Sequence, residues 1–293
     1  MLKKSLQFAI VIFFLNSVSY ANETSQKLYN VINNILENKT QNMEMVSKAS
    51  QNKILSQMIA KDVVLLVAKV SPKYYYNELL ESTKKFNENL NYIKKQKLNA
   101  ESQKDFNDTQ KVWLEFVDNI KHIYNKGKID KKRYQYILDN NEKLLRLSHK
   151  LMQSLQSQNT LNLTGSKVEE HTLKFADRER MLTQKMFKEK FLIFIKKDEA
   201  RNRIRLRGSY ILFENTLKAL LHGDKKRGII PVTNRSLREK IEEMKKVWDK
   251  TKAYYSKYDV DAKDMLELIK SERKLYKLSD EIVNKIEHST EIY

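Results

Sequence analysis

KILSQ, at residues 53–57, returns 127 positions later as RMLTQ, at residues 180–184. The same offset continues without a gap in later pairs: Lys61 with Lys188, Asp62 with Glu189, Phe86 with Phe213, and Leu90 with Leu217. A match that keeps its spacing over so long a stretch indicates an internal repeat. The chain is therefore expected to contain one structural unit twice.

Two later blocks recur at slightly different offsets. Residues 111–113 return as residues 246–248, and residues 143–148 return as residues 274–279. Offsets of 135 and 131 mean that small insertions and deletions separate the blocks, and the expected insertion is residues 223–231, which are rich in turn-forming and basic residues. Two modules of ordinary domain size are predicted: residues 22–157 and residues 166–293, separated by a polar linker at residues 157–166.

Apolar residues recur with helical spacing in both halves. The stripe in the first half is Ile137, Leu144, Leu147, Leu151 and Leu155, and its counterpart is Leu268, Leu275, Leu278, Ile282 and Ile286. Only five glycines and two prolines interrupt 293 residues, which also favours helices. The predicted fold class is all-α, with two tandem antiparallel four-helix-bundle modules that have long first helices. Helices are expected at residues 24–70, 74–97, 101–126, 129–157, 166–198, 200–221, 233–256 and 260–289.

Aromatic residues are expected mainly in the core. Trp113 has Phe116 at helical spacing, and Trp248 has Tyr255, so both indoles are expected to pack among apolar side chains. The run of three tyrosines at residues 74–76 is expected to pack at a helix start. None of these aromatic residues is expected to be a ligand site.

The N-terminus has the pattern of a secretory signal. Lys3 and Lys4 precede an apolar stretch at residues 6–15, and a small-x-small cleavage site follows at residues 19–21. A signal peptide at residues 1–21 and a periplasmic location are predicted; the alternative is a chain anchored to the inner membrane by an uncleaved signal. No later stretch approaches the roughly 20 apolar residues of a transmembrane helix. The absence of cysteine excludes disulfides, a lipoprotein anchor and thiol catalysis.

The net charge of +19 is spread evenly along the chain. Residues 22–156 carry 23 basic and 15 acidic side chains, a net charge of +8, and residues 157–293 carry 31 and 22, a net charge of +9. A nucleic-acid-binding arm concentrates its charge in one stretch or on one face. No nucleic-acid partner is therefore expected, whereas a small anionic ligand or an anionic surface is compatible with the charge.

Arrangements typical of catalysis are missing from the sequence. The five histidines are scattered, and no two of them lie three or four residues apart as in a helical zinc site. No glycine-rich phosphate loop occurs, and the acidic pair before His171 suits the start of a helix. The protein is expected not to be an enzyme and to need neither a cofactor nor a metal.

Residues 49–57 (ASQNKILSQ) and 176–186 (ADRERMLTQKM) resemble the AGRQRMLSQR-type signature of the PilJ-like domain. That domain is the N-terminal sensory region of type IV pilus methyl-accepting transducers, and it is similar to the periplasmic region of NarX-type nitrate and nitrite sensors. The resemblance implies a periplasmic helical bundle that perceives a small ligand and passes a shift along its helices. In the nitrate sensors, an arginine of the signature grips the anion across a dimer interface.

The resemblance implies Arg178 or Arg180 as the equivalent of that arginine, and Gln51 and Lys53 at the matching positions of the first copy. The signature glycine is replaced by Ser50 and Asp177. Two guanidinium groups with a neighbouring amide would suit an oxyanion through bidentate hydrogen bonds. The candidate ligand-binding residues are Arg178, Arg180, Gln184, Lys185, Lys53 and Gln57. The alternative is that Asp177 simply pairs with Arg180 on the helix surface.

Two functions remain open from the sequence. The leading hypothesis is an exported sensory or ligand-binding protein that binds a small anion. It is expected to signal through a separate membrane-bound partner, since a transducer needs a transmembrane helix and a cytoplasmic output domain and neither is expected in this chain. The alternative is an exported structural or adhesive protein that binds anionic envelope polymers. A homodimer is an open alternative for the oligomeric state.

Overall fold

The computed structural model describes residues 40–125, 128–158 and 167–288. Residues 40–67 form the first described helix. Further elements follow in the order α2 (Pro72–Lys94), α3 (Ala100–Lys121), β1 (Tyr124–Asn125), β2 (Lys128–Ile129), α4 (Lys131–Gln158), α5 (Lys167–Phe194), α6 (Glu199–His222), η1 (Lys225–Arg227), α7 (Arg235–Ser256) and α8 (Ala262–His288). The predicted signal peptide and most of the predicted linker lie outside the described residues.

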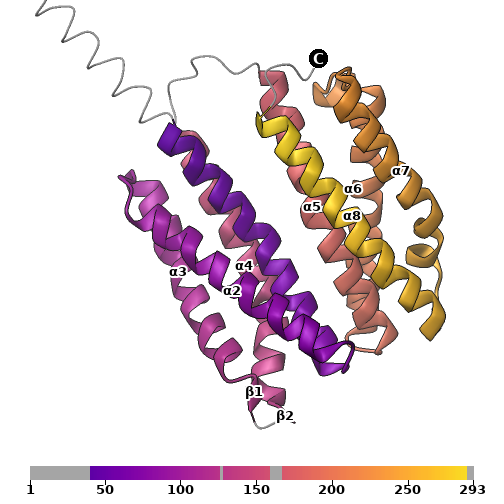
Figure 1. Cartoon of the computed structure of the whole chain (residues 1–293). Coiled ribbons are helices and arrows are strands. Elements are labelled where there is room, and N and C mark those ends of the chain that lie inside the picture. The colour runs from indigo at the N-terminus through magenta and orange to yellow at the C-terminus, as the bar shows by residue number, and fades with distance from the viewer. Residues whose placement is uncertain (1–39, 126–127, 159–166, 289–293) are drawn as a thin grey trace, which may run out of the picture.

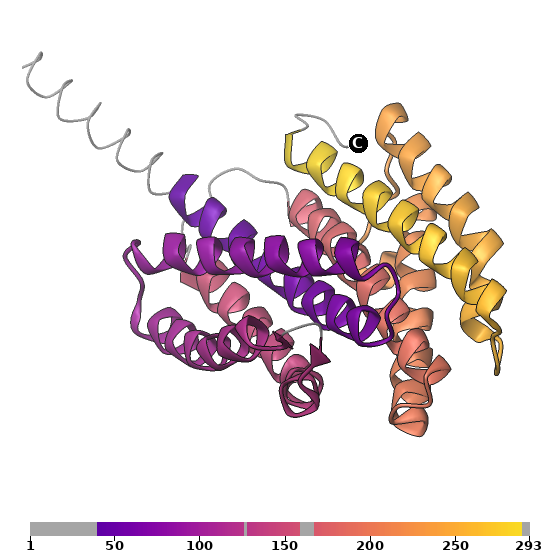
Figure 2. The same ribbon diagram turned by 60° about the horizontal axis from the view of Figure 1, so that its bottom comes forward.

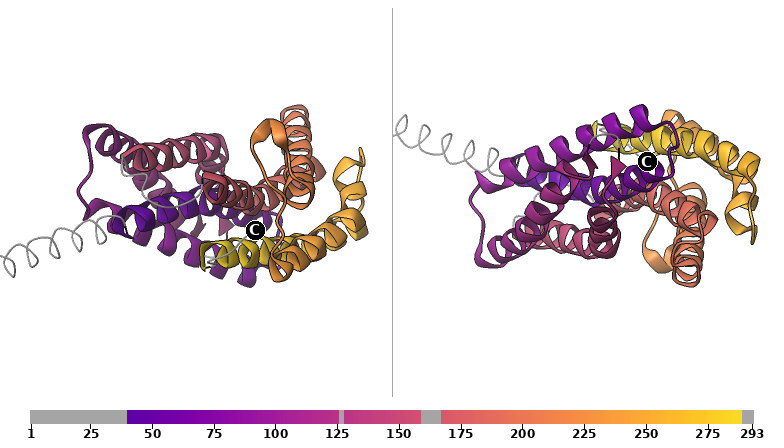
Figure 3. Two further views of the ribbon diagram at one scale, coloured as in Figure 1. Left: turned by 90° about the horizontal axis from the view of Figure 1, so that it is seen from above. Right: turned by 90° about the horizontal axis from the view of Figure 1, so that it is seen from below.

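The prediction of an all-α fold is confirmed. The helix at residues 40–67 lies together with α2 to α4 on one side of the molecule, and α5 to α8 lie together on the other, as Figures 1 and 2 show. We call these groups the N-terminal bundle and the C-terminal bundle. Figure 3 shows the two bundles from above and from below, where they lie side by side. Within the C-terminal bundle, α5 packs against both α6 and α8.

The predicted apolar stripes form the core of each bundle. Ile137, Leu144, Leu151 and Leu155 are buried along α4, and all five residues of the second stripe are buried along α8. Both tryptophans are core residues, as predicted. The ring of Trp113 stacks on Phe86 with centroids 3.8 Å apart, and the ring of Trp248 lies 4.6 Å from that of Phe213.

Several helices begin at a residue that carries a local start signal. The side chain of Asn99 accepts a hydrogen bond from the Ser102 amide at 2.8 Å, and that of Asn234 accepts one from the Leu237 amide at 3.1 Å. Each asparagine thereby satisfies an amide that the first helical turn leaves without an intrahelical partner. Pro72 opens α2, where the missing amide hydrogen is no loss.

The predicted end of the third helix is wrong. The third helix was expected to reach residue 126, but α3 ends at Lys121 and a two-residue antiparallel hairpin of β1 and β2 follows. The Asp130 carboxylate then caps α4, because it accepts hydrogen bonds from the amides of Lys132 and Arg133 at 2.8 and 3.2 Å. The helical period alone could not place this turn.

Residues 223–231 form a compact turn between α6 and α7. Asp224 and Ile229 form an isolated antiparallel bridge, and η1 lies between them. Gly223 begins the turn with a φ of 77°, a conformation that suits glycine. The Val232 amide donates to the Leu220 carbonyl at 3.0 Å, which fastens the turn to the end of α6.

Candidate functional site

The helix at residues 40–67 and α5 lie side by side and run in the same direction. Asp177 of α5 accepts a hydrogen bond from Ser50, and further along both helices Lys188 donates to Gln57 at 2.8 Å. These contacts join the two segments that carry the predicted signature. We call the polar contacts between the bundles, centred on these two helices and completed by α4 and α8, the inter-bundle interface.

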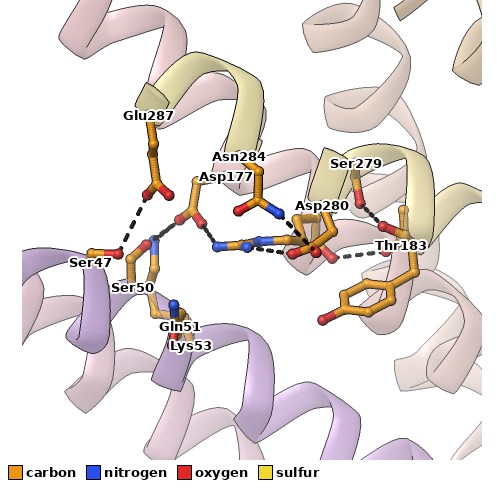
Figure 4. Close-up of polar contacts among 12 residues, drawn as sticks. Ser47, Ser50, Gln51, Lys53, Asp177, Thr183, Ser279, Asp280, Asn284 and Glu287 are labelled. Carbon is orange, nitrogen blue, oxygen red and sulfur yellow. Dashed lines mark hydrogen bonds and ion pairs between the residues drawn. The ribbon is translucent and has the colours of Figure 1, made fainter. Parts of the chain in front are cut away.

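Asp177 is the anion at one end of the inter-bundle interface, as Figure 4 shows. Its side chain lies in contact with the Ser50 hydroxyl and 3.0 Å from Lys53 Nζ, both in the other bundle. Its second oxygen lies 2.9 Å from an Arg180 nitrogen. Burial opposes ionisation of Asp177, but Lys53 and Arg180 outweigh it and hold the pKa below its ordinary value.

Arg180 is shared between two carboxylates. Besides Asp177, its guanidinium contacts Asp280 of α8 at 2.7 Å. The pairing of Asp177 with Arg180 is therefore present, but it is buried and not the solvated surface pair that the alternative interpretation assumed, since both side chains are under one-tenth exposed. The charges of Lys53 and Arg180 are already matched by protein carboxylates.

Lys188 is the buried cation at the middle of the inter-bundle interface. Its Nζ donates to Gln57 at 2.8 Å, to Asn141 at 2.7 Å and to Glu142 at 3.3 Å, all in the N-terminal bundle. Burial lowers the pKa of Lys188 to about 8, although Glu142 opposes this shift. Lys185, one turn earlier, also contacts Glu142, at 2.9 Å, as well as Glu189 of its own helix.

Lys61 occupies the corresponding place on the other helix. Its Nζ lies 3.5 Å from Glu272 of α8, 3.2 Å from Glu78 and 3.4 Å from Asp62. Burial opposes its charge, but these three carboxylates outweigh burial and raise the pKa of Lys61 well above its usual range. Gln184 of α5 donates to the same Glu272 oxygen at 2.5 Å.

The contacts across the interface repeat at positions that the sequence spacing pairs. Lys61 and Lys188 are 127 positions apart, and Asn141 and Glu272 are 131 positions apart. Lys61 contacts Glu272 in the other bundle, and Lys188 contacts Asn141 in the other bundle. Each bundle thus offers a lysine and receives one at matching places, which is the contact pattern of an isologous interface.

Sequence reasoning missed the acceptors on α4 and α8. Asn141 lies four residues after Ile137 and three before Leu144, so a polar residue interrupts the buried stripe. Glu272 interrupts the second stripe in the same way, between Leu268 and Leu275. A polar residue on a buried helix face needs a polar partner. A polar residue within an apolar stripe was therefore the sequence signal that could have located these acceptors.

Arg178 faces a different part of the molecule. Its Nη2 donates to Thr216 of α6 at 2.7 Å, and its guanidinium lies 4.4 Å from the Phe175 ring centroid. Arg180, two residues later, points to α8 instead. The structure therefore does not bring the two guanidinium groups together, because residues two apart on a helix do not share a face.

The six candidate residues consequently separate into three places. Lys53 and Arg180 surround Asp177; Gln57, Gln184 and Lys185 belong to the middle of the inter-bundle interface; and Arg178 lies between α5 and α6. Over the described ranges, no group of histidine, cysteine, aspartate or glutamate side chains is placed to hold a metal. No helix there combines the length and the apolar character needed to cross a membrane.

A match to a known protein family lies within the C-terminal bundle. Residues 175–271 match the family model described as the type IV pili methyl-accepting chemotaxis transducer N-term, PilJ. This segment is PilJ-like. It begins in the α5 signature and includes α6, α7 and the first part of α8. The match is consistent with a sensory helical protein. No curated protein and no solved structure gives a significant match to the chain.

Proposed function

We propose that the protein is an exported sensory module that binds a small ligand and passes a displacement between its two bundles to a separate membrane-bound partner. We further propose that the bundles are tandem copies of one PilJ-like unit, arranged as an internal pseudo-dimer. The observation that carries the proposal is the parallel pairing of the two signature helices across a buried polar interface. The PilJ-like segment supplies one of those helices.

The buried lysines of the inter-bundle interface have several acceptors each, which suits a displacement of one bundle against the other. Lys188 has three oxygen acceptors within 3.3 Å, and Lys61 has three carboxylates within 3.5 Å. A small shift of one helix can therefore exchange partners without leaving a buried charge unpaired, which would be costly. A helix pair of this kind can have two discrete arrangements of similar free energy. A ligand that binds one arrangement more tightly then shifts the population toward it, as in sensory transitions.

A distance measurement between the bundles tests this proposal. The chain has no cysteine, so spin labels attach only at introduced ones, at Met43→Cys on the first helix and Lys277→Cys on α8. Both side chains are exposed, which keeps the substitutions mild. We expect a ligand from a panel of small anions and metabolites to raise the unfolding temperature and to change the distance distribution together.

A panel in which no compound changes that distance would overturn the proposal. Binding to anionic polymers that falls steeply with salt, with the bundles fixed relative to each other, would support the structural or adhesive alternative instead. The matched control is a label pair within one bundle, at Lys277→Cys and Lys250→Cys on α7. Its distance should stay constant when the ligand moves one bundle against the other.

A further inference from the structure

A surface pocket of about 340 Å³ lies beside the first half of α5, away from the inter-bundle interface. Its lining consists of Lys174, Phe175 and Arg178 of α5 and of Arg227, the last residue of η1. The lining therefore holds three cationic side chains, one aromatic ring and no carboxylate. Its volume lies within the range of roughly 300 to 1,000 Å³ of small-molecule sites.

Two guanidinium groups gather around the Phe175 ring. The Arg178 Cζ lies 4.4 Å from the ring centroid, and the Arg227 Cζ lies 5.9 Å from it. Burial lowers the pKa of Arg178; the adjacent Glu179 opposes this shift, and the nearby charge of Arg227 adds to it. The two cations thus repel each other across the pocket. An anion between them would relieve that repulsion.

Nearby acids neutralise this charge only in part. Asp224 accepts a hydrogen bond from Arg227 Nε at 2.6 Å. The two terminal nitrogens of Arg227 make no hydrogen bond to a described residue. Glu179 lies next to Arg178 in the chain, and burial raises its pKa well above the usual range, which disfavours its charged form. Lys225 and Lys226 add further positive charge beside the pocket.

The pocket is held in shape by the elements around it. Thr216 accepts from Arg178 and donates to the Leu212 carbonyl at 2.8 Å, which fixes the guanidinium against α6. Arg178 Nε is buried and has no hydrogen-bond partner among the described residues. The Asp224–Ile229 bridge fixes the turn that carries Arg227. A ligand would therefore meet cations that are already in position, at a low cost in conformational entropy.

We infer that this pocket binds a small multivalent oxyanion, a di- or tricarboxylate or an organic phosphate, and that it is the ligand site on which the proposed sensory function rests. The planar fork of a guanidinium matches both carboxylate and phosphate oxygens. Two guanidinium groups that line one pocket favour a ligand with more than one negative charge. The Phe175 ring offers an apolar flank to the ligand's carbon atoms.

Calorimetric titration of the full chain at fixed ionic strength tests this inference, with citrate and glycerol 3-phosphate as probes and acetate as the monovalent comparison. We expect at least one multivalent probe to bind saturably and more tightly than acetate. Arg227→Gln and Arg178→Gln should each raise its Kd by about ten- to a hundredfold, as expected for loss of a charge-assisted hydrogen bond. Arg207→Gln, at an exposed arginine of α6 outside the pocket, is the matched control and should leave the Kd unchanged.

The inference is overturned if neither multivalent probe binds saturably, if acetate binds equally well, or if all three variants weaken binding alike. Arg227 is partly exposed at the end of a turn, so its variant decides the question even if Arg178→Gln unfolds. If the probes fail but another compound changes the inter-bundle distance, only the pocket assignment falls. If a probe binds here and the bundles stay fixed, the sensory proposal falls instead.

Discussion

Asp177 stands at the position of the signature glycine, and its carboxylate lies between cations from both bundles. A carboxylate side chain thus takes the place beside the signature cations where an external anion was expected to lie. The sequence placed Asp177, Arg180 and Lys53 in the right segments. It could not show that they meet, because the contact depends on how two distant helices pack.

Replacing Asp177 with Asn should destabilise the protein by about 3 kcal/mol at pH 7, because a buried ion pair loses one partner. The pKa of Asp177 is lowered in the folded protein, so its stabilisation is present above the ordinary pKa and disappears as the pH falls through the folded value. The difference in unfolding free energy between wild type and variant should therefore vanish in acid. Denaturant unfolding across that pH range measures it.

Asp280→Asn is the matched control for that variant. Its carboxylate also contacts Arg180, but it is 40% exposed, so solvent screens the pair and its loss should cost less than about 1 kcal/mol. If both variants lowered the free energy of unfolding equally, the stabilisation would come from pairing Arg180 with a carboxylate and not from the contact between the bundles. A loss for Asp177→Asn that persists unchanged in acid would contradict the role of its charge.

At the scale of elements, helical spacing predicted most of the structure because burial of an apolar stripe fixes both the helix and its inward face. The stripe from Ile137 to Leu155 and its counterpart on α8 are buried as expected. Helix ends were harder, since a cap or a hairpin depends on a few polar contacts. The end of α3 at Lys121 and the capping of α4 by Asp130 are examples.

The turn after α6 offers a test with an internal control. Gly223 has a φ of 77°, and an added Cβ would lie 2.9 Å from the Pro231 Cδ. Gly223→Ala should therefore lower the unfolding free energy by at least about 1 kcal/mol. Gly208 lies inside α6 with nothing within 4 Å of an added Cβ, so Gly208→Ala should raise stability by about 0.5–1 kcal/mol. Thermal unfolding of both variants should shift in opposite directions, and equal shifts would contradict the described turn.

At the scale of the whole molecule, the two bundles meet through lysines that each reach across to the other bundle. Internal repetition predicted two similar halves but gave no information on their relative placement. Packing between halves depends on which polar side chains interrupt the apolar faces. Asn141 and Glu272 are those interruptions, and only the three-dimensional structure shows that they face the lysines of the other bundle.

The central claim is that the two signature helices lie side by side in parallel, with position 50 facing position 177. Oxidation of a Ser50→Cys, Asp177→Cys double variant measures this directly, because the chain has no other cysteine. The account predicts rapid formation of an intramolecular disulfide, since these side chains touch. The out-of-register pair Ser50→Cys, Lys188→Cys should stay reduced, because eleven residues along a helix span about 16 Å. Failure of the first pair in a folded variant, or preferential oxidation of the second, would contradict the paired arrangement.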